Sequence, residues 1–220
     1  IAHDLRSPMA SIRMVLNLVV QTVSPEAIGP EMYYLIDKAN RETEETHDLL
    51  DNLLKWTKSQ TGRLKVAFQE FEISDVITGV ADIFSLIAET KKIKLTTEYH
   101  EDGLKVRADK DMLNTVLRNF LSNAVKFSNE DSSIEIVVSR KDNFAKVGIR
   151  DHGVGIAPDR IDSIFHKGET TYGTNNEEGS GLGLQLCKDF AVKNGGDVMV
   201  ESVVGEGSTF SVLVPLLAEG

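Results

Sequence analysis

The sequence is poor in cysteine and has no long apolar run, and these two features exclude internal disulfides and argue against a membrane-spanning helix. Its 220 residues include one cysteine, Cys187, so no disulfide can form within the chain, and a reducing compartment is expected. No run approaches the roughly 18 apolar residues typical of a membrane-spanning helix, and no signal peptide is visible. We therefore expect a soluble segment in which Cys187 is a small core residue.

Positive charge is also scarce. The 24 Lys and Arg residues face 34 Asp and Glu residues, which gives a formal net charge of −10. This balance argues against a surface for nucleic acid or anionic membrane, so an anionic ligand would need a local site. The chain has no internal repeat, no low-complexity segment and no Cys/His cluster with zinc-site spacing. Its composition is that of an ordinary globular protein of one or two domains.

Two helices with coiled-coil spacing are expected at the start of the chain. Residues 1–22 carry apolar side chains at alternating four- and three-residue spacing, and residues 31–60 follow a heptad frame. This spacing is typical of a coiled coil or an antiparallel bundle. Two helices alone leave too much apolar surface exposed, so we expect a second copy to complete a four-helix bundle. Alternatively, the hairpin packs on its own C-terminal domain and stays monomeric.

The pattern changes after Gly62, which predicts a helical domain at 1–64 and an α/β domain at 65–220. Helices are expected at 73–91, 110–127 and 182–194, and strands at 65–71, 93–100, 104–108, 134–140, 145–151, 197–203 and 208–213. Residues 152–180 lack periodicity apart from a helical turn near 159–165, which is typical of a functional lid. The expected fold class is α+β.

The helix expected at 110–127 carries polar side chains along one flank. Asn119 and Asn123 are one turn apart, and Lys126 follows. Amide oxygens suit Mg²⁺, which usually keeps several waters and shares phosphate oxygens. The flank could therefore hold a metal-bridged phosphate chain, or it could be the wet face of an ordinary surface helix.

Two glycine-containing segments could complete such a site. Asp151 ends a strand and precedes Gly153 and Gly155, so a flat ligand could approach the backbone while the carboxylate accepts from an amine. A simple turn capped by Asp151 is the alternative. Residues 179–184 read Gly-Ser-Gly-Leu-Gly-Leu and open a helix, whose N–H groups form an anion site. Their spacing matches neither a dinucleotide fingerprint nor a P-loop.

In this order, the segments resemble the ATP-binding domain of sensor histidine kinases, whose fold is shared with gyrase-type ATPases. The polar helix resembles the family's N box, and the two glycine segments resemble its G1 and G2 boxes. Residues 161–165 resemble the F box and 205–210 the last glycine box. Residues 3–8, His-Asp-Leu-Arg-Ser-Pro, resemble the H box on the first helix of the dimerisation and histidine-phosphotransfer domain.

The resemblance implies an α/β sandwich of the gyrase/histidine-kinase (Bergerat) type and assigns residue roles. His3 would be the phospho-acceptor, and Asp4 would hydrogen-bond its imidazole. Mg²⁺ would be held by Asn123 and Asn119. The residues implied in ATP binding are Asn119, Asn123, Lys126, Phe127, Asp151, Gly153, Gly155, Gly179, Gly181, Leu182, Gly183 and Thr209.

The implied activity is ATP-dependent autophosphorylation of His3, followed by transfer to an aspartate of a response regulator in two-component signalling. The partners would be a second copy, joined through the helical hairpin, and the regulator's receiver domain, with no nucleic acid. The chain would be the cytoplasmic portion of a membrane-anchored sensor whose upstream segment is absent. Ser7 is shorter than the Thr, Asn or Gln of relatives with strong phosphatase activity, so the resemblance leaves that activity open.

Two other functions compete with this one. The first is a nucleotide-gated scaffold that works by dimerisation and docking without kinase chemistry. The second is another ATPase of the gyrase-like fold. Those enzymes use a glutamate on the central helix to activate water, and Asn119 stands where that glutamate is expected.

Overall fold

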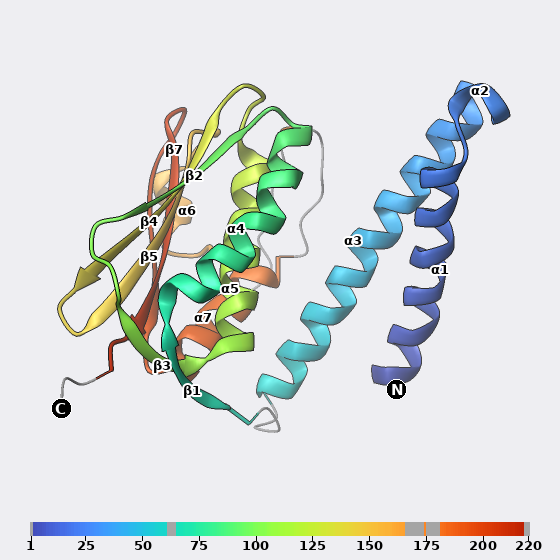
Figure 1. Ribbon diagram of the computed structural model, residues 1–220. Coiled ribbons are helices and arrows are strands. Elements are labelled where there is room, and N and C mark those ends of the chain that lie inside the picture. Colours follow the sequence, from blue (N-terminus) through green and yellow to red (C-terminus); the bar gives the residue numbers. More distant parts are fainter. Residues whose placement is uncertain (1, 61–64, 166–173, 175–180, 218–220) are drawn as a thin grey trace. The chain divides into compact units, whose positions relative to one another are not determined.

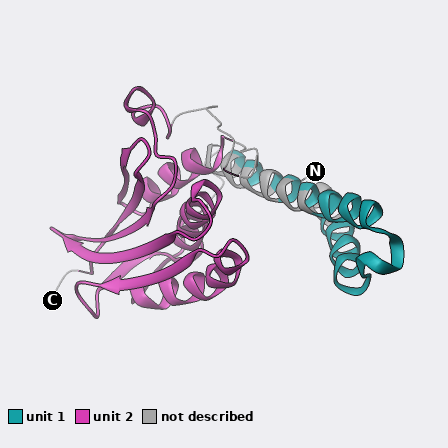
Figure 2. Ribbon diagram, turned by 90° about the horizontal axis from the view of Figure 1, so that it is seen from above, with its two compact units in different colours: residues 1–64 teal, residues 65–220 magenta. Residues whose placement is uncertain are grey.

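The computed structural model describes residues 2–60, 65–165, 174 and 181–217. The chain divides into two compact units, residues 1–64 and 65–220 (Figure 2). Within the described ranges, no helix combines the length and apolar character needed to cross a bilayer.

The first unit is a helical hairpin. Its long helices, α1 (Ala2–Thr22) and α3 (Pro30–Gln60), run antiparallel and are joined by the short helix α2 (Pro25–Ile28) (Figure 1). The sequence predicted the two long helices and a break between them. It did not predict α2, which begins with a proline, a residue whose fixed φ suits the first helical position.

The two long helices share a polar contact and leave much apolar surface exposed. Asn40 is buried, and its Nδ2 donates to Asn17 Oδ1 at 2.9 Å. Large apolar side chains on α1 and α3 are 38% to 75% exposed, namely Ile12, Met14, Val15, Leu18, Met32, Tyr34, Leu35 and Leu53. An apolar surface of this extent is typical of an interaction site.

The second unit is an α/β sandwich. Its helices are α4 (Ile73–Thr90), α5 (Lys110–Phe127), α6 (Pro158–Ile161) and α7 (Gly183–Lys193). Its strands are β1 (Phe68–Glu72), β2 (Lys94–Tyr99), β3 (Lys105–Asp109), β4 (Ser133–Lys141), β5 (Phe144–Asp151), β6 (Asp197–Val203) and β7 (Gly207–Pro215). The mixed α+β class is confirmed, and the strand order along the chain follows the sequence pattern.

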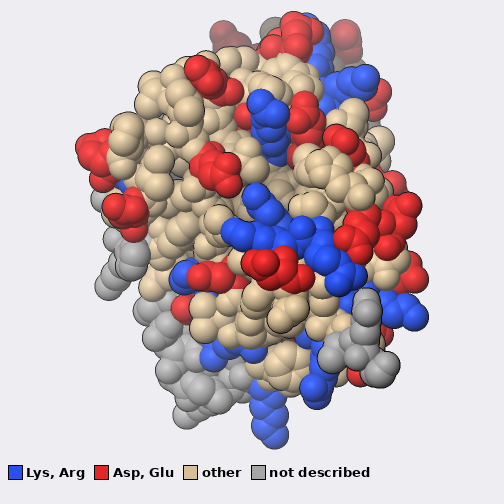
Figure 3. Space-filling model, turned by 90° about the vertical axis from the view of Figure 1, so that its left-hand side faces the viewer, with Lys and Arg blue, Asp and Glu red and all other residues tan. Residues whose placement is uncertain are grey.

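Five strands form one sheet in the order β2-β4-β5-β7-β6, in which β2 and β4 are parallel and the other pairs antiparallel. Strands β1 and β3 form a separate antiparallel pair. Helices α4, α5 and α7 cover one face of the five-stranded sheet (Figure 1). The other face is open to solvent and carries interspersed acidic and basic side chains (Figure 3).

The core lies between the sheet and these helices. Phe120 of α5 is fully buried, with its ring centroid 5.5 Å from that of Phe210 on β7. Phe165, at the end of the segment that resembles the F box, meets Phe210 edge-on at 6.3 Å. Cys187 of α7 is also fully buried, as predicted, and burial raises the pKa of its thiol, so it is a packing residue.

Candidate functional site

Most of the site lies on α5, whose start is fixed by Asp109. This carboxylate caps the helix by accepting from Asp111 N at 3.1 Å and Met112 N at 3.0 Å. Its other oxygen accepts from Ala67 N at 2.8 Å. The backbone N–H of Asp109 donates to Asn194 Oδ1 at 2.6 Å, which ties α5 to the end of α7. The polar flank of α5 is therefore presented by a firmly held helix.

Asn119 lies against the start of α7. Its Nδ2 donates to Thr115 O at 2.8 Å, one turn earlier on α5. Its Oδ1 lies so close to Gly183 that a Cβ added to this glycine would be 2.5 Å from the oxygen. The structure thus brings together two residues that the sequence assigned to one site, and only glycine fits without displacing the amide.

The rest of the polar flank is partly exposed. Asn123, Lys126 and Phe127 follow Asn119 on α5, and each has an intermediate exposure. Lys126 Nζ lies 5.4 Å from the ring centroid of Phe127. For a hard cation, this flank offers the carboxamide oxygens of Asn119 and Asn123.

Asp151 is an almost buried acceptor at the end of β5. Its side chain is 4% exposed, and Oδ1 accepts from Gly153 N at 2.9 Å and Ser208 N at 3.2 Å. Desolvation raises the pKa of Asp151, and this outweighs the two backbone hydrogen bonds and the nearby His152, which act in the opposite direction. A fixed acceptor in a dry environment suits a polar hydrogen on a flat ligand.

The glycines after Asp151 fasten this segment to its neighbours. A Cβ at Gly153 would collide with the carbonyl of Phe127, and one at Gly155 would collide with that of Val203. Gly153 forms an antiparallel bridge with Ser128, just beyond α5. Asp151 and the end of α5 are thereby held on either side of Gly153.

The structure does not bring Thr209 to this site. Side chains alternate across a strand, and the Thr209 methyl group lies 3.6 Å from a Cβ built on Gly148, on the open face of the sheet. Its neighbour Ser208, whose N–H bonds Asp151, lies on the site side. The sequence did not assign Ser208 to the site, although the period of two along β7 places it on the same face as the apolar Phe210.

The glycine-rich segment is described in part. Gly181 has a φ of +66°, Leu182 follows it, and Gly183 begins α7 beside Asn119. Gly179 lies outside the described residues. So do the side chains of His3 and Asp4, although the backbone of both belongs to α1.

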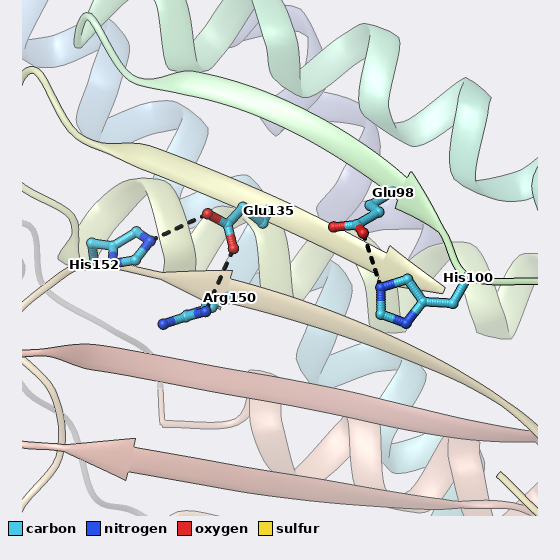
Figure 4. Close-up of polar contacts among 5 residues, drawn as sticks. All are labelled: Glu98, His100, Glu135, Arg150 and His152. Atoms are coloured by element: carbon cyan, nitrogen blue, oxygen red, sulfur yellow. Dashed lines mark hydrogen bonds and ion pairs between the residues drawn. The ribbon is translucent and has the colours of Figure 1, made fainter. Parts of the chain in front are cut away.

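Two histidines contact glutamates at the surface (Figure 4). His152 Nε2 lies 3.5 Å from Glu135 Oε1, and the second oxygen of Glu135 lies 3.8 Å from Arg150 Nη1. His100 Nε2 lies 3.0 Å from Glu98 Oε1. Exposed pairs of this kind contribute little to stability.

Comparison with known proteins agrees with this geometry. The family model for histidine kinase-, DNA gyrase B- and HSP90-like ATPases matches residues 108–218. The chain belongs to this family. The matched range contains α5, Asp151 and the start of α7, and the Bergerat-type sandwich implied by the sequence is confirmed.

Named relatives extend the similarity to the helical hairpin. The autoinducer 2 sensor kinase/phosphatase LuxQ of Vibrio parahaemolyticus is 30% identical, over 98% of this chain and 26% of LuxQ. The sensor histidine kinase ZraS of Escherichia coli is 28% identical, over 98% of this chain and 44% of ZraS. The chain thus spans less than half of the length of each of these relatives.

A solved structure has the same fold. The crystal structure of full-length ShkA in complex with AMPPNP is 24% identical, with a TM-score of 0.75 over 99% of this chain and 45% of that chain. With the family match and the relatives, the resemblance to a histidine kinase catalytic core is confirmed.

Proposed function

We propose that the chain is the core of a sensor histidine kinase that phosphorylates His3 with the γ-phosphate of ATP. The observation that carries this proposal is the meeting of Asn119 with Gly183 at the start of α7. It places a carboxamide oxygen beside the N-terminus of a helix, where backbone N–H groups attract phosphate. The carboxamide oxygen can bind a cation and the helix N-terminus can bind an anion, so the two together suit a metal-bound triphosphate.

The nucleotide would be recognised at both of its ends. Asp151 would accept a hydrogen bond from the adenine amine, and Phe127 would lie against the nucleotide. Lys126 and the backbone of Gly181, Leu182 and Gly183 would face the phosphates, together with Gly179. The AMPPNP in ShkA, which shares the fold, supports an adenine nucleotide here.

The residues on α5 fit a magnesium ion. Asn123 and Asn119 have neutral, hard oxygens, and the hydrogen bond from Asn119 Nδ2 to Thr115 O leaves its Oδ1 on the side of α7. Mg²⁺ in such a place would offset charge on the phosphates during transfer.

The chemistry at the acceptor is attack by a neutral imidazole. A nitrogen of His3 would form a bond to the γ-phosphorus while the bond from that phosphorus to the leaving oxygen of ADP breaks. Asp4 would accept a hydrogen bond from the other ring nitrogen and orient the imidazole. The phosphoryl group would then pass to an aspartate on the receiver domain of a response regulator.

The apolar surface of the hairpin supports a homodimer through a four-helix bundle. The relatives are named as sensor proteins, so we further propose that the chain works in the cytoplasm as the kinase part of a longer, membrane-anchored sensor.

Labelling with γ-labelled ATP and Mg²⁺ tests the proposal against its two competitors. We expect an acid-labile, base-stable label on the protein that is lost in His3→Ala and in Asn123→Ala, while His3→Ala still binds ATP. Binding without any label would favour a nucleotide-gated scaffold. Release of free phosphate without protein label would favour an ATPase of the same fold.

A further inference from the structure

Lys91 is a buried lysine that the proposed mechanism does not use. It directly follows α4 and is 8% exposed. Its Nζ donates to Val125 O at 3.0 Å and to Lys126 O at 3.2 Å. Both carbonyls belong to the last turn of α5, where the helix itself supplies no donor. Lys91 therefore caps the end of the helix that carries the proposed nucleotide site.

The third contact of this ammonium is with Thr174, at 2.6 Å from Oγ1. Thr174 belongs to the segment that the sequence predicted to be a lid, and it is docked against the same helix end. Its N–H donates to Lys126 O at 3.1 Å, and its hydroxyl lies 3.0 Å from both Lys126 O and Ser128 O. Because a hydroxyl has one proton, Oγ1 accepts from Lys91 and donates to one of these carbonyls.

All three acceptors of Lys91 are neutral oxygens. Burying an ammonium costs free energy, and here the compensation is the partial negative charge at the C-terminal end of α5 together with three hydrogen bonds. An apolar side chain of similar volume often serves stability as well as a buried charge does. The charge is therefore informative, because it adds a bond from the end of α4 to both the last turn of α5 and Thr174.

The same helix end also holds the adenine side of the site. Val154 N donates to Phe127 O at 3.3 Å, and Gly153 bridges Ser128. The last turn of α5 is thus the point where α4, Thr174 and the segment after Asp151 converge.

We propose that Lys91 is a positioning residue for nucleotide binding, which fixes the last turn of α5 and anchors Thr174 to it. The inference rests on the proposed function, since the site it positions is the ATP site. Loss of the ammonium would loosen the last turn of α5, which carries Lys126 and Phe127, and its contact with Thr174. Nucleotide affinity would then fall more than the rate of the chemical step.

Lys91→Met tests this in the whole chain, because it keeps the apolar stem and removes the three donors. We expect the KM for ATP in autophosphorylation, and the Kd for AMPPNP by calorimetry, to rise about tenfold, with kcat changed less than about threefold. The matched control is Lys92→Met. Lys92 is a neighbouring lysine whose side chain is 67% exposed and pairs with Glu130 at 3.6 Å. It should leave both constants unchanged.

Thr174→Val removes the hydroxyl and keeps the shape, so it tests the proposal even where Lys91→Met fails to fold. It should raise the KM for ATP, and Thr174→Ser should restore it. If the two residues act as a unit, Lys91→Met combined with Thr174→Val should be no worse than Lys91→Met alone.

An unchanged KM in both single variants, with a wild type that binds ATP and labels, would overturn the role of Lys91 alone. A wild type that takes up no adenine nucleotide would overturn the proposed function and this inference together.

Discussion

At the scale of single residues, Asp151 has a structural role beside the recognition role proposed for it. Its Oδ1 accepts two backbone hydrogen bonds, so it shapes the turn after β5 as well as offering an acceptor. The sequence left these roles as alternatives, and the structure shows that the turn is present. An asparagine has the same shape and keeps the oxygen, so Asp151→Asn separates the carboxylate charge from the turn.

We expect Asp151→Asn to fold with an unfolding free energy at pH 7 no lower than that of the wild type. Folding raises the pKa of Asp151, so the buried carboxylate opposes folding above that pKa, and this opposition disappears as the carboxyl is protonated. The unfolding free energy of the variant minus that of the wild type should therefore shrink as the pH falls from 7 towards the ordinary pKa of an aspartate. Urea unfolding followed by circular dichroism measures this difference. A difference that grows on acidification would contradict the assigned direction.

Gly183 offers a second prediction at this scale. In Gly183→Ala the new methyl group must displace the Asn119 amide oxygen, so the affinity for Mg²⁺-AMPPNP should fall by about tenfold or more, equal to about 1.4 kcal/mol. Calorimetric titration with the nucleotide measures it. Gly79→Ala is the matched control, because a Cβ at Gly79 meets nothing within 4 Å on α4. That variant should bind normally and gain about 0.5 to 1 kcal/mol of stability from better helix propensity. Equal affinities in the two variants would remove Asn119 from the site.

The sequence could propose which residues share a site but not how they touch. Asn119, Asp151 and Gly183 were assigned by motif order, since each motif carries its own chemistry. The contact of Asn119 with Gly183 depends on how α5 and α7 pack, and no local pattern encodes that distance. Thr209 was assigned to the site from the resemblance to a glycine box alone. The alternation of side chains along β7 places it on the opposite face of the sheet.

At the scale of secondary-structure elements, periodicity and capping signals were sufficient for most of the chain. The helix expected at 110–127 matches the observed bounds of α5, Lys110–Phe127. Contacts between the ends of elements were not predictable. Lys91 and Asn194 come directly after helices and read as ordinary end residues, yet they hold the two ends of α5.

The pair of Asn17 and Asn40 supplies the prediction for the helical hairpin. Asn40 is buried, and its Oδ1 has no hydrogen-bond partner among the described residues, so the pair is a weak point for stability and a strong constraint on helix register. Asn40→Leu should cost about 1 kcal/mol because it leaves the Asn17 amide without its donor. Replacing both residues with leucine should recover that loss or exceed it. Fluorescence of the chain's single tryptophan, Trp56, follows urea unfolding of this unit. If the double variant is less stable than Asn40→Leu, the pair is a net stabilising contact.

At the scale of the whole molecule, the division near residue 64 coincides with the change in sequence pattern from heptads to alternating strands and helices. Each unit has its own sequence pattern, so the boundary between them could be predicted without information on how the two units are arranged. The pattern could not predict what covers the exposed apolar surface of α1 and α3. A second copy and the chain's own second unit were both consistent with the spacing.

Oligomeric state in solution decides between these two occupants. Ile12 is an apolar residue of α1 that is 49% exposed in the single chain, whereas burial of an isoleucine contributes about 1.5 to 3 kcal/mol. In a symmetric dimer the substitution Ile12→Glu acts twice, so it should weaken association by about a hundredfold or more in sedimentation equilibrium. Leu86→Glu is the control, because Leu86 is an exposed residue of α4 in the other unit, at 69%. It should leave the dimer intact. A wild type that sediments as a monomer at all concentrations would rule out the second copy. A lower unfolding free energy of Ile12→Glu, at unchanged mass, would then indicate that the apolar side chains are covered within one chain.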